Sequence, residues 1–512
     1  MLLYPNPQTR QKNLSPDGFE RRVWTANDVY PGPIIRANKG DKIFVNVTNC
    51  FGEPASIHWH GLTQKETNWY DGAPGFTQCP IPNDVSLVYD FSTYGQSGTY
   101  WWHSHYLTQY VDGLRGTLII HDPDDPYLKS YDEEYVITLS DWYHNNSSTL
   151  LSDRMAPGYE GFDPIPDSGL ISGKGRYDCS AAPKDSKCTP NAPLATYKFK
   201  KGRRYRLRLI NTSTEYFFTF SIDEHKLKII ETDGEYVEPY TVEKIPINIG
   251  QRYSVIVEAN QAIDNYWIRA TMNKECAHSN NFTININSAI NYEVVGILKY
   301  EGAKNDEPTT KESNEQHDRC KDLSTKFLIP LNAKPAPEPV HKIITLNTTA
   351  ITNEKNVTVF TVNGKTFSPD FQNPTLQRIL NGEDPNTFPD DQVTFVYDEP
   401  NGVIEVRLIN NGIGTHPFHM HGHNFFVLGS GDGTEVVESE LNYKNPTIRD
   451  TVTLPAMSWT VIRFLADNPG VWAFHCHIEW HVEMGLVAQL IESPTELAKR
   501  QPPKDWSSLC SK

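Results

Sequence analysis

Histidines are the residues of this chain most suited to chemistry, because they occur in pairs separated by one residue. The chain has 512 residues and 17 histidines, so chance placement would produce fewer than one such pair on average. On a β-strand, residues i and i+2 project from the same face, so each pair aims two imidazoles at one point. This pattern indicates metal binding rather than exposed strand histidines. Five pairs are present: His58/His60, His103/His105, His419/His421, His421/His423 and His475/His477.

A cysteine between the two histidines of the last pair narrows the choice of metal. Cys476 stands between His475 and His477, and His481 follows five residues after it. One thiolate with two imidazoles is the trigonal ligand set of blue-copper sites. Zinc accepts the same ligand types, but a zinc site would not require histidines on both sides of the cysteine. On one strand the flanking histidines point away from the thiolate, so neighbouring residues can bind different metal ions.

The elements that must position these residues are short β-strands. Segments rich in β-branched residues alternate in polarity between turn residues, for example 42–48, 117–121, 205–210, 253–257 and 404–409. A glycine turn, an alternating strand and a closing asparagine recur three times, at 39–49, 201–211 and 401–410. This repeat indicates three related β-sandwich domains. Because the histidine blocks lie near the two ends of the chain, a shared site requires the first and third domains to meet.

Composition excludes several classes of partner. Lys plus Arg is 47 and Asp plus Glu is 63, a net charge of −16, which argues against nucleic-acid and membrane binding. No apolar run reaches the roughly 18 residues of a spanning helix. Eight cysteines fit an oxidising compartment, and no signal-peptide pattern opens the chain. Asn-X-Ser/Thr sequons predict a secreted glycoprotein, at Asn13, Asn46, Asn145, Asn146, Asn211, Asn281, Asn347 and Asn356.

The four histidine blocks resemble the signature motifs of the multicopper oxidases. They are 57–61, 100–105, 416–423 and 475–481, and the resemblance runs from about Gly32 to Cys510. It implies an all-β fold of three tandem cupredoxin domains, each a Greek-key β-sandwich. We expect domain 1 at 1–125, domain 2 at 126–305, a linker at 306–334, domain 3 at 335–495 and a C-terminal tail at 496–512.

Carried over residue by residue, the resemblance implies four copper ions, with O₂ as co-substrate. Type 1 copper would take His416, Cys476 and His481, and type 2 copper would take His58 and His419. The type 3 pair would take His60, His103 and His477 on one copper, and His105, His421 and His475 on the other. His423 lies outside this set, and we assign it a structural or supporting role.

Residues near these ligands are expected to tune the reaction. Leu486 occupies the position where many cupredoxins place an axial methionine, and a side chain without a donor atom should raise the reduction potential. We interpret Met484 as a packing residue. Asp71 and Glu479 match positions where the family keeps carboxylates that serve oxygen reduction. Without the resemblance, Asp71 would be a turn residue before glycine and Glu479 a solvated charge.

The resemblance also implies disulfides. Cys79 and Cys510 resemble the pair that fixes the C-terminal tail to domain 1 in laccases and ascorbate oxidases. Cys179 and Cys188 lie in a stretch similar to ascorbate oxidases. Cys276 with Cys320 is a further hypothesis, which leaves Cys50 as the odd thiol.

For the reducing substrate, a laccase-like enzyme that oxidises phenols and aromatic amines is favoured. In the family, electrons enter at the type 1 histidine, here His481. The stretch 219–225 resembles the place where fungal laccases carry the carboxylate that accepts the phenol's proton. Asp223, with Glu224 next, is therefore our candidate substrate residue. We expect a monomer with a small aromatic reductant.

Three alternatives stay open. Asp163 occupies a position where ferroxidases place a glutamate, and the negative charge could attract Fe²⁺. Ascorbate oxidases resemble the stretches 173–179 and 233–237, but Tyr143 and Phe360 stand where plant enzymes stack ascorbate on tryptophans. A copper-binding protein without turnover is the non-enzymatic alternative.

Overall fold

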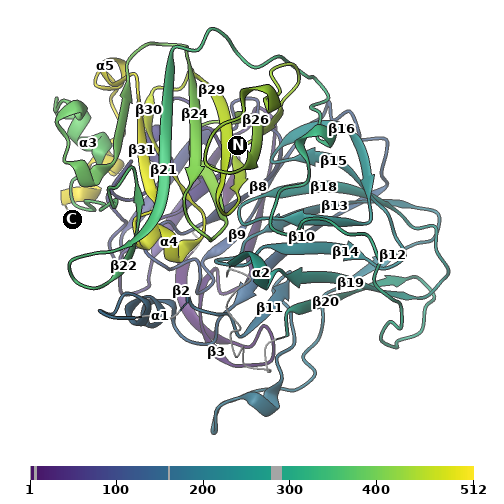
Figure 1. The fold of residues 1–512 in the computed structure, drawn as a ribbon. Coiled ribbons are helices and arrows are strands. Elements are labelled where there is room, and N and C mark those ends of the chain that lie inside the picture. Colours follow the sequence, from purple (N-terminus) through teal and green to yellow (C-terminus); the bar gives the residue numbers. More distant parts are fainter. Residues whose placement is uncertain (1, 5–7, 160–161, 278–290, 512) are drawn as a thin grey trace.

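Three β-sandwiches make up the molecule. The computed structural model describes residues 2–4, 8–159, 162–277 and 291–511, and these residues form six sheets, two in each sandwich. In Figure 1 the teal sheets of domain 2 lie to the right of the green and yellow sheets of domain 3, and the purple strands of domain 1 pass behind and below them. This arrangement confirms the predicted all-β fold of three cupredoxin domains.

The first sandwich carries two of the histidine blocks. One of its sheets contains β1 (Leu2–Tyr4), β5 (Lys42–Asn49), β2 (Gln8–Leu14), β3 (Arg21–Ala26) and β7 (Ser86–Ser92). The other has the order β4 (Gly32–Asn38), β9 (Arg115–His121), β8 (Gly98–His103) and β6 (His58–His60). Strands β6 and β8 are antiparallel, and their register sets His58 opposite His103. Pairing of two strands thus brings the two blocks together.

The second sandwich has its own hydrophobic core. Its first sheet has the order β11 (Ser168–Ile171), β10 (Glu133–Trp142), β13 (Arg204–Asn211), β18 (Arg252–Glu258), β15 (Leu227–Thr232) and β16 (Glu235–Val242). Its second sheet has the order β12 (Thr196–Phe199), β20 (Glu293–Tyr300), β19 (Asn265–Met272), β14 (Phe218–Ile222) and β17 (Lys244–Ile247). Strands β13 and β18 also contact β8 of domain 1.

The third sandwich carries the other two blocks. One sheet has the order β22 (Thr358–Val362), β21 (Lys342–Thr352), β24 (Gly402–Asn410), β29 (Ser458–Ala466), β26 (Phe425–Asp432) and β27 (Thr447–Arg449). The other has the order β23 (Thr394–Tyr397), β31 (Val487–Glu492), β30 (Gly470–Cys476), β25 (His416–Met420) and β28 (Thr451–Leu454). Antiparallel pairing of β25 with β30 sets His419 opposite His475.

One continuous hydrophobic cluster runs through domains 1 and 3. It includes Trp59 and Leu118 of domain 1 together with Phe418 and Trp472 of domain 3. Burial of apolar surface is the main favourable term in such contacts, so this shared cluster holds the two ends of the chain together. It provides the meeting of first and third domains that the histidine blocks require.

Helices are few and short in the described residues. They are α1 (Ser147–Arg154), α2 (Lys274–Ala277), α3 (Thr375–Leu380), α4 (Glu479–Glu483), α5 (Pro494–Leu497) and α6 (Lys504–Ser507). Among them, none combines the length and apolar character that crossing a membrane would require. Helix α4 follows β30 directly and carries His481.

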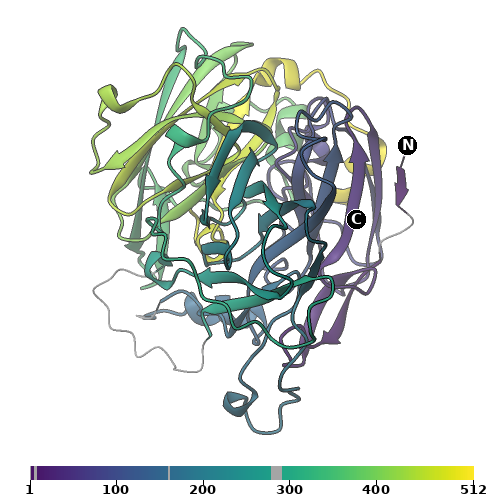
Figure 2. The same ribbon diagram turned by 90° about the vertical axis from the view of Figure 1, so that its right-hand side faces the viewer.

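Three disulfides are formed, namely Cys79–Cys510, Cys179–Cys188 and Cys276–Cys320. The first joins the C-terminal tail to domain 1, where the indole of Trp506 is also buried and donates to the carbonyl of Thr77 at 3.0 Å. Figure 2 shows the yellow C-terminal segments beside the purple N-terminal strands. Cys50 is a free, half-buried thiol.

Not all predicted sequons can carry a glycan in this fold. Asn211 is fully buried, and its side-chain amide donates to the carbonyl of Ile247 at 3.0 Å. Asn281 lies outside the described residues. Asn46 is half-buried, whereas the remaining sequons expose their asparagines: Asn13, Asn145, Asn146, Asn347 and Asn356.

Candidate metal centre

Cys476, His416 and His481 form a buried triad inside domain 3. The Sγ atom of Cys476 lies 3.6 Å from Nδ1 of His416 and 3.5 Å from Nδ1 of His481, and the two nitrogens are 3.1 Å apart. His416 begins β25, Cys476 ends β30, and α4 turns His481 back toward both. One sulfur and two nitrogens converging on a point is the ligand set of a blue-copper site.

Leu486 lies against this triad through its backbone. Its carbonyl accepts from the amide of Cys476 at 3.1 Å, and its own amide donates to the carbonyl of His481 at 2.9 Å. Its side chain is fully buried. Met484 is buried too, and its carbonyl accepts from the amide of Phe360 at 2.9 Å.

The other eight predicted ligands gather between domains 1 and 3. Nδ1 of His60 is 3.2 Å from Nε2 of His477, and His103 completes a group of three. Nε2 of His475 is 3.1 Å from Nε2 of His421 and 3.5 Å from Nε2 of His105, which forms a second group. His58 and His419 stack on members of both groups: His58 on His421 at 3.8 Å, and His419 on His60 at 3.7 Å between ring centroids.

Residues 475–477 join the two centres through consecutive residues. The thiol of Cys476 belongs to the triad, whereas His475 and His477 belong to two different histidine groups. His475 also donates from Nδ1 to the carbonyl of Cys476 at 2.8 Å. The alternation of side chains along a strand therefore produces a direct covalent link between the centres.

Buried nitrogens without partners show that the histidine groups fit metal ions. Among the described residues, Nε2 of His58, His103 and His419 and Nδ1 of His477 have no hydrogen-bond partner although they are buried. Burying such atoms unpaired is costly, and a metal ion would satisfy them. Burial also lowers the pKa of His105 and His477 to about 3. These imidazoles are therefore neutral, as metal binding requires.

The thiol of Cys476 fits the same picture. Burial raises its pKa well above the usual value, so a metal ion must displace its proton on binding. Sulfur and nitrogen donors without a carboxylate in the triad favour copper. Copper is thus the metal that this donor set selects.

Asp71 holds two of the predicted ligands. Its backbone carbonyl accepts from Nδ1 of His58 at 2.8 Å, and its carboxylate accepts from Nδ1 of His421 at 2.7 Å. A hydrogen bond to one ring nitrogen fixes the tautomer and leaves the other nitrogen free for metal. Asp71 is therefore placed beside both the type 2 and type 3 ligands that the resemblance implied.

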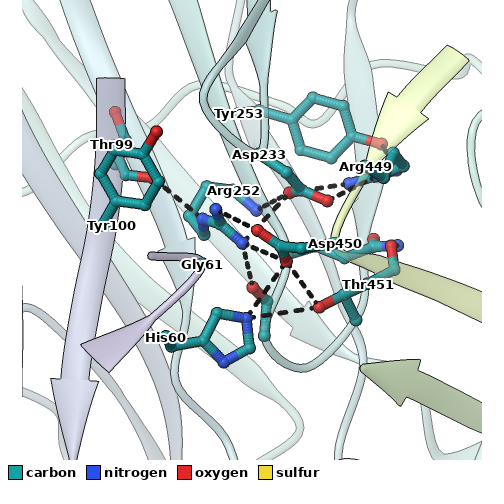
Figure 3. Close-up of polar contacts among 12 residues, drawn as sticks. His60, Gly61, Thr99, Tyr100, Asp233, Arg252, Tyr253, Arg449, Asp450 and Thr451 are labelled. Carbon is teal, nitrogen blue, oxygen red and sulfur yellow. Dashed lines mark hydrogen bonds and ion pairs between the residues drawn. The ribbon is translucent and has the colours of Figure 1, made fainter. Parts of the chain in front are cut away.

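Asp450 plays the same part for two other ligands, and sequence reasoning missed it. Its backbone carbonyl accepts from Nδ1 of His419 at 2.9 Å, and its carboxylate lies 3.3 Å from Nε2 of His60. Figure 3 shows it between His60 and the guanidinium of Arg252. Its partners are distant in sequence, so nothing in the Arg449-Asp450 dipeptide could have indicated this role.

Glu479 begins α4, three residues after Cys476. It is buried, its amide donates to the carbonyl of Thr214 at 3.1 Å, and burial together with the neighbouring Glu483 raises the pKa of its carboxyl well above the usual range. The alternative interpretation of Glu479 as a solvated charge is therefore wrong. Its part in proton supply stays a prediction.

The outer edge of the triad carries a carboxylate. Nε2 of His481 donates to Asp163 at 3.0 Å, and Asp163 also accepts from Arg154 at 2.7 Å. The ring of Phe360 lies 4.1 Å from that of His481. Tyr143 is buried, and its hydroxyl accepts from Trp480 at 3.4 Å.

Asp223 and Glu224 are not brought to this edge. Asp223 follows β14, is buried, and accepts from Nε of Arg269 at 2.8 Å and from Thr310 at 2.7 Å. Glu224 is exposed on the adjoining turn. Arg269 and Thr310 are not predicted copper ligands. The carboxylate of Asp223 thus forms an ion pair within domain 2 and does not contact the triad.

Glu215 is a second carboxylate that sequence reasoning overlooked. It is buried, and neither carboxylate oxygen has a hydrogen-bond partner among the described residues. Burial, with a further contribution from Asp163, raises its pKa well above the usual value. The preceding residue, Thr214, accepts from the amide of Glu479 close to His481. An unpaired buried carboxyl beside the triad is a typical functional signal.

Comparisons with known proteins agree with this geometry. Family models described as multicopper oxidase match residues 8–125, 133–303 and 352–496. Laccase-1 of Agaricus bisporus is 40% identical over 97% of this chain and 92% of its own length. The laccase of Phlebia radiata is 41% identical over 97% of this chain and 91% of its own length.

Two solved structures are also similar. The crystal structure of the laccase from Botrytis aclada has a TM-score of 0.87 at 34% identity, over 99% of this chain and 91% of that one. Fet3p, described as a multicopper oxidase that functions in iron import, has a TM-score of 0.87 at 28% identity, over 99% and 94%. The chain belongs to the multicopper oxidase family. Within that family it is laccase-like, and it is a copper-dependent oxidoreductase.

Proposed function

We propose that this protein uses one type 1, one type 2 and a pair of type 3 copper ions to oxidise phenols and aromatic amines by single electrons and to reduce O₂ to water. The observation that carries the proposal is residues 475–477, whose side chains divide between the sulfur-containing triad and two histidine groups. When bound, four copper ions supply the four electrons that reduction of O₂ to two water molecules requires.

Electron entry is assigned to the edge of His481. Its Nε2 donates to Asp163, which Arg154 holds in place from the other side. Asp163 can accept the proton that a phenol loses on oxidation, because its carboxylate is partly exposed beside the entry histidine. The adjacent ring of Phe360 offers an apolar contact to an aromatic reductant.

Glu215 is assigned a supporting part at the same edge. Since its buried carboxyl has no hydrogen-bond partner among the described residues, a polar group of the reductant can pair with it. The carboxylate of Asp163 at this edge also favours a cation, and for this reason Fe²⁺ is the second candidate substrate. The likeness to a protein of iron import supports including it in the test.

The oxygen side of the reaction is assigned to the eight histidines between domains 1 and 3. Asp71 orients His58 and His421 there and is our candidate to hold and deliver a proton. Exposed sequons and three disulfides support secretion as a glycosylated protein. We also propose that the protein is a monomer, since all predicted ligands lie in one chain.

The decisive experiment measures O₂ uptake by the copper-loaded protein with a phenol, an aromatic amine, Fe²⁺ and ascorbate. We expect the highest kcat/KM for the aromatic reductants. Higher kcat/KM for Fe²⁺ would replace the laccase assignment with a ferroxidase, and uptake with ascorbate alone would indicate an ascorbate oxidase. Absence of uptake with all four would overturn the oxidase proposal.

A matched pair of variants tests the electron-entry edge. Asp163→Asn removes a charge-assisted hydrogen bond, which is worth about 1.5–3 kcal/mol, so kcat/KM for phenols should fall by about 10–100-fold. Asp223→Asn is the control, because its carboxylate pairs with Arg269 away from the triad. A larger loss of phenol oxidation in Asp223→Asn, in protein of unchanged copper content, would restore the sequence-based assignment.

A further inference from the structure

Four fully buried charged side chains meet where the three domains join. Arg252 and Asp233 come from domain 2, and Arg449 and Asp450 come from domain 3. Two cations and two anions balance one another, so the cluster carries no net charge. Figure 3 shows Arg252 facing both aspartates, with Arg449 beyond Asp233.

Arg252 contacts both of the other domains. Its Nη1 and Nη2 each donate to Asp450 at 2.6 Å, one to each carboxylate oxygen. Its Nε donates to the carbonyl of Thr99 in domain 1 at 2.9 Å. A two-point contact of this kind fixes the plane of the carboxylate as well as its position. Arg252 thus touches domain 1 and orients a side chain of domain 3.

Asp450 in turn contacts two of the predicted histidine ligands, His60 and His419. Its Oδ1 accepts from the hydroxyl of Thr451 at 2.9 Å and lies 3.3 Å from Nε2 of His60. With Nε2 directed at a carboxylate, His60 presents Nδ1 to His477 at 3.2 Å. Nδ1 of His419 is fixed by the carbonyl of Asp450, which leaves its buried Nε2 for metal.

Asp71 and Asp450 are counterparts. Each accepts from one type 2 ligand through its backbone carbonyl and faces one type 3 ligand with its carboxylate: Asp71 serves His58 and His421, and Asp450 serves His419 and His60. They differ in their surroundings, because Arg252 clamps the carboxylate of Asp450. Domain 2 therefore contacts Asp450, which supports His419 and His60, through Arg252.

We propose that Arg252 is a positioning residue for the copper cluster, so that domain 2 shapes a site to which it contributes none of the predicted ligands. The inference rests on the proposed copper assignment. Supporting residues that orient metal-binding histidines typically change metal affinity by about 10–100-fold. Loss of the Arg252 clamp should therefore weaken the binding of copper by His60 and His419, and should leave copper binding by the Cys476 triad unchanged.

The experiment compares two arginines on neighbouring strands. Arg252→Gln removes the clamp. Arg206→Gln, the matched control, removes an equally buried arginine of β13 that pairs with Asp125 and Glu231 and touches no predicted ligand. Each copper-loaded protein is dialysed against increasing concentrations of a copper chelator, and copper per chain and the type 1 and type 2 electron paramagnetic resonance signals are recorded.

We expect Arg252→Gln to lose the type 2 signal at about 10–100-fold lower chelator concentration than the wild type, with its type 1 signal retained, while Arg206→Gln behaves as the wild type. If Arg252→Gln does not fold, Arg252→Lys takes its place. Lysine keeps the charge without the two-point contact, so the same selective loss is expected.

Equal retention of the type 2 signal in the Arg252 variant and the wild type would overturn this inference and leave the proposed function standing. A wild-type protein that binds copper only at the Cys476 triad would instead contradict the proposed function itself. Selective loss of the type 2 signal in Arg206→Gln as well would also overturn the inference, because any buried charge in domain 2 would then have the same effect.

Discussion

At the scale of single residues, Leu486 is our candidate for the axial position of the Cys476 triad, where its side chain would offer no donor atom. Leu486→Met would offer a thioether to the copper, stabilise the oxidised form and lower the type 1 reduction potential. Redox titration of the blue absorption measures the change. Met484→Leu is the control, since the backbone of Met484 contacts Phe360 rather than a predicted ligand. An unchanged potential in Leu486→Met would remove Leu486 from the axial position.

Asp71 allows a second test at this scale. Asp71→Asn keeps an oxygen that can accept from His421, so copper content should stay complete. The variant loses a group that can hold a proton, and reoxidation by O₂ should slow by about 100-fold, as is typical of general acid–base residues. Stopped-flow reoxidation of the fully reduced protein provides the rate. Wild-type reoxidation in a fully loaded variant would exclude Asp71 from proton delivery.

The sequence indicated the candidate ligands far better than it indicated the residues that support them. The two-residue period of a strand makes paired histidines visible without any structure. The eleven predicted ligands lie in the Cys476 triad, in the two groups of three histidines and in the pair His58 and His419. Asp223 and Glu215 are both acids near β14, and their difference arises from distant partners. Arg269, which neutralises Asp223, lies 46 residues further along the chain, whereas the carboxylate of Glu215 has no hydrogen-bond partner within the described part of the chain. Only the fold shows which of the two acids is paired within domain 2 and which is unpaired among the described residues.

At the scale of elements, the predicted strands agree with the structure. The segments 42–48, 205–210 and 404–409 lie within β5, β13 and β24. The predicted linker is less separate than its composition suggested. Leu323 and Leu328 pack into the domain 2 core, and the hydroxyl of Thr447 donates to the carbonyl of Leu328 at 2.8 Å. Polar, proline-rich sequence identified an irregular segment but could not show that it is packed.

The C-terminal tail provides a prediction about elements. Cys79–Cys510 closes a separation of 431 residues, and Cys179–Cys188 closes one of 9. A disulfide restricts the unfolded chain, and it does so more strongly when the loop that it closes is longer. Replacing both cysteines of the first pair by serine should therefore lower the free energy of unfolding by about 2–5 kcal/mol. The same change in the second pair should cost less. Calorimetric midpoints measure both, and a larger drop for the short loop would contradict the prediction.

At the scale of the whole molecule, a net charge of −16 should act on charged reductants at a distance. Such fields change association rates by about 10-fold or more and are screened by salt. We expect kcat/KM to fall with ionic strength for a cationic aromatic amine and to rise for an anionic phenol. A neutral phenol is the control and should change little. The same salt response for all three would show that the entry edge does not feel the overall charge.

The eight histidines between the domains divide evenly, with four from domain 1 and four from domain 3, whereas the Cys476 triad lies wholly within domain 3. Gradual unfolding should therefore remove the two activities in sequence. Once the first and last sandwiches separate, the protein would still be blue and could still take an electron, yet it could no longer pass that electron to oxygen. Colour would report an intact third domain, and oxygen consumption would report an intact junction.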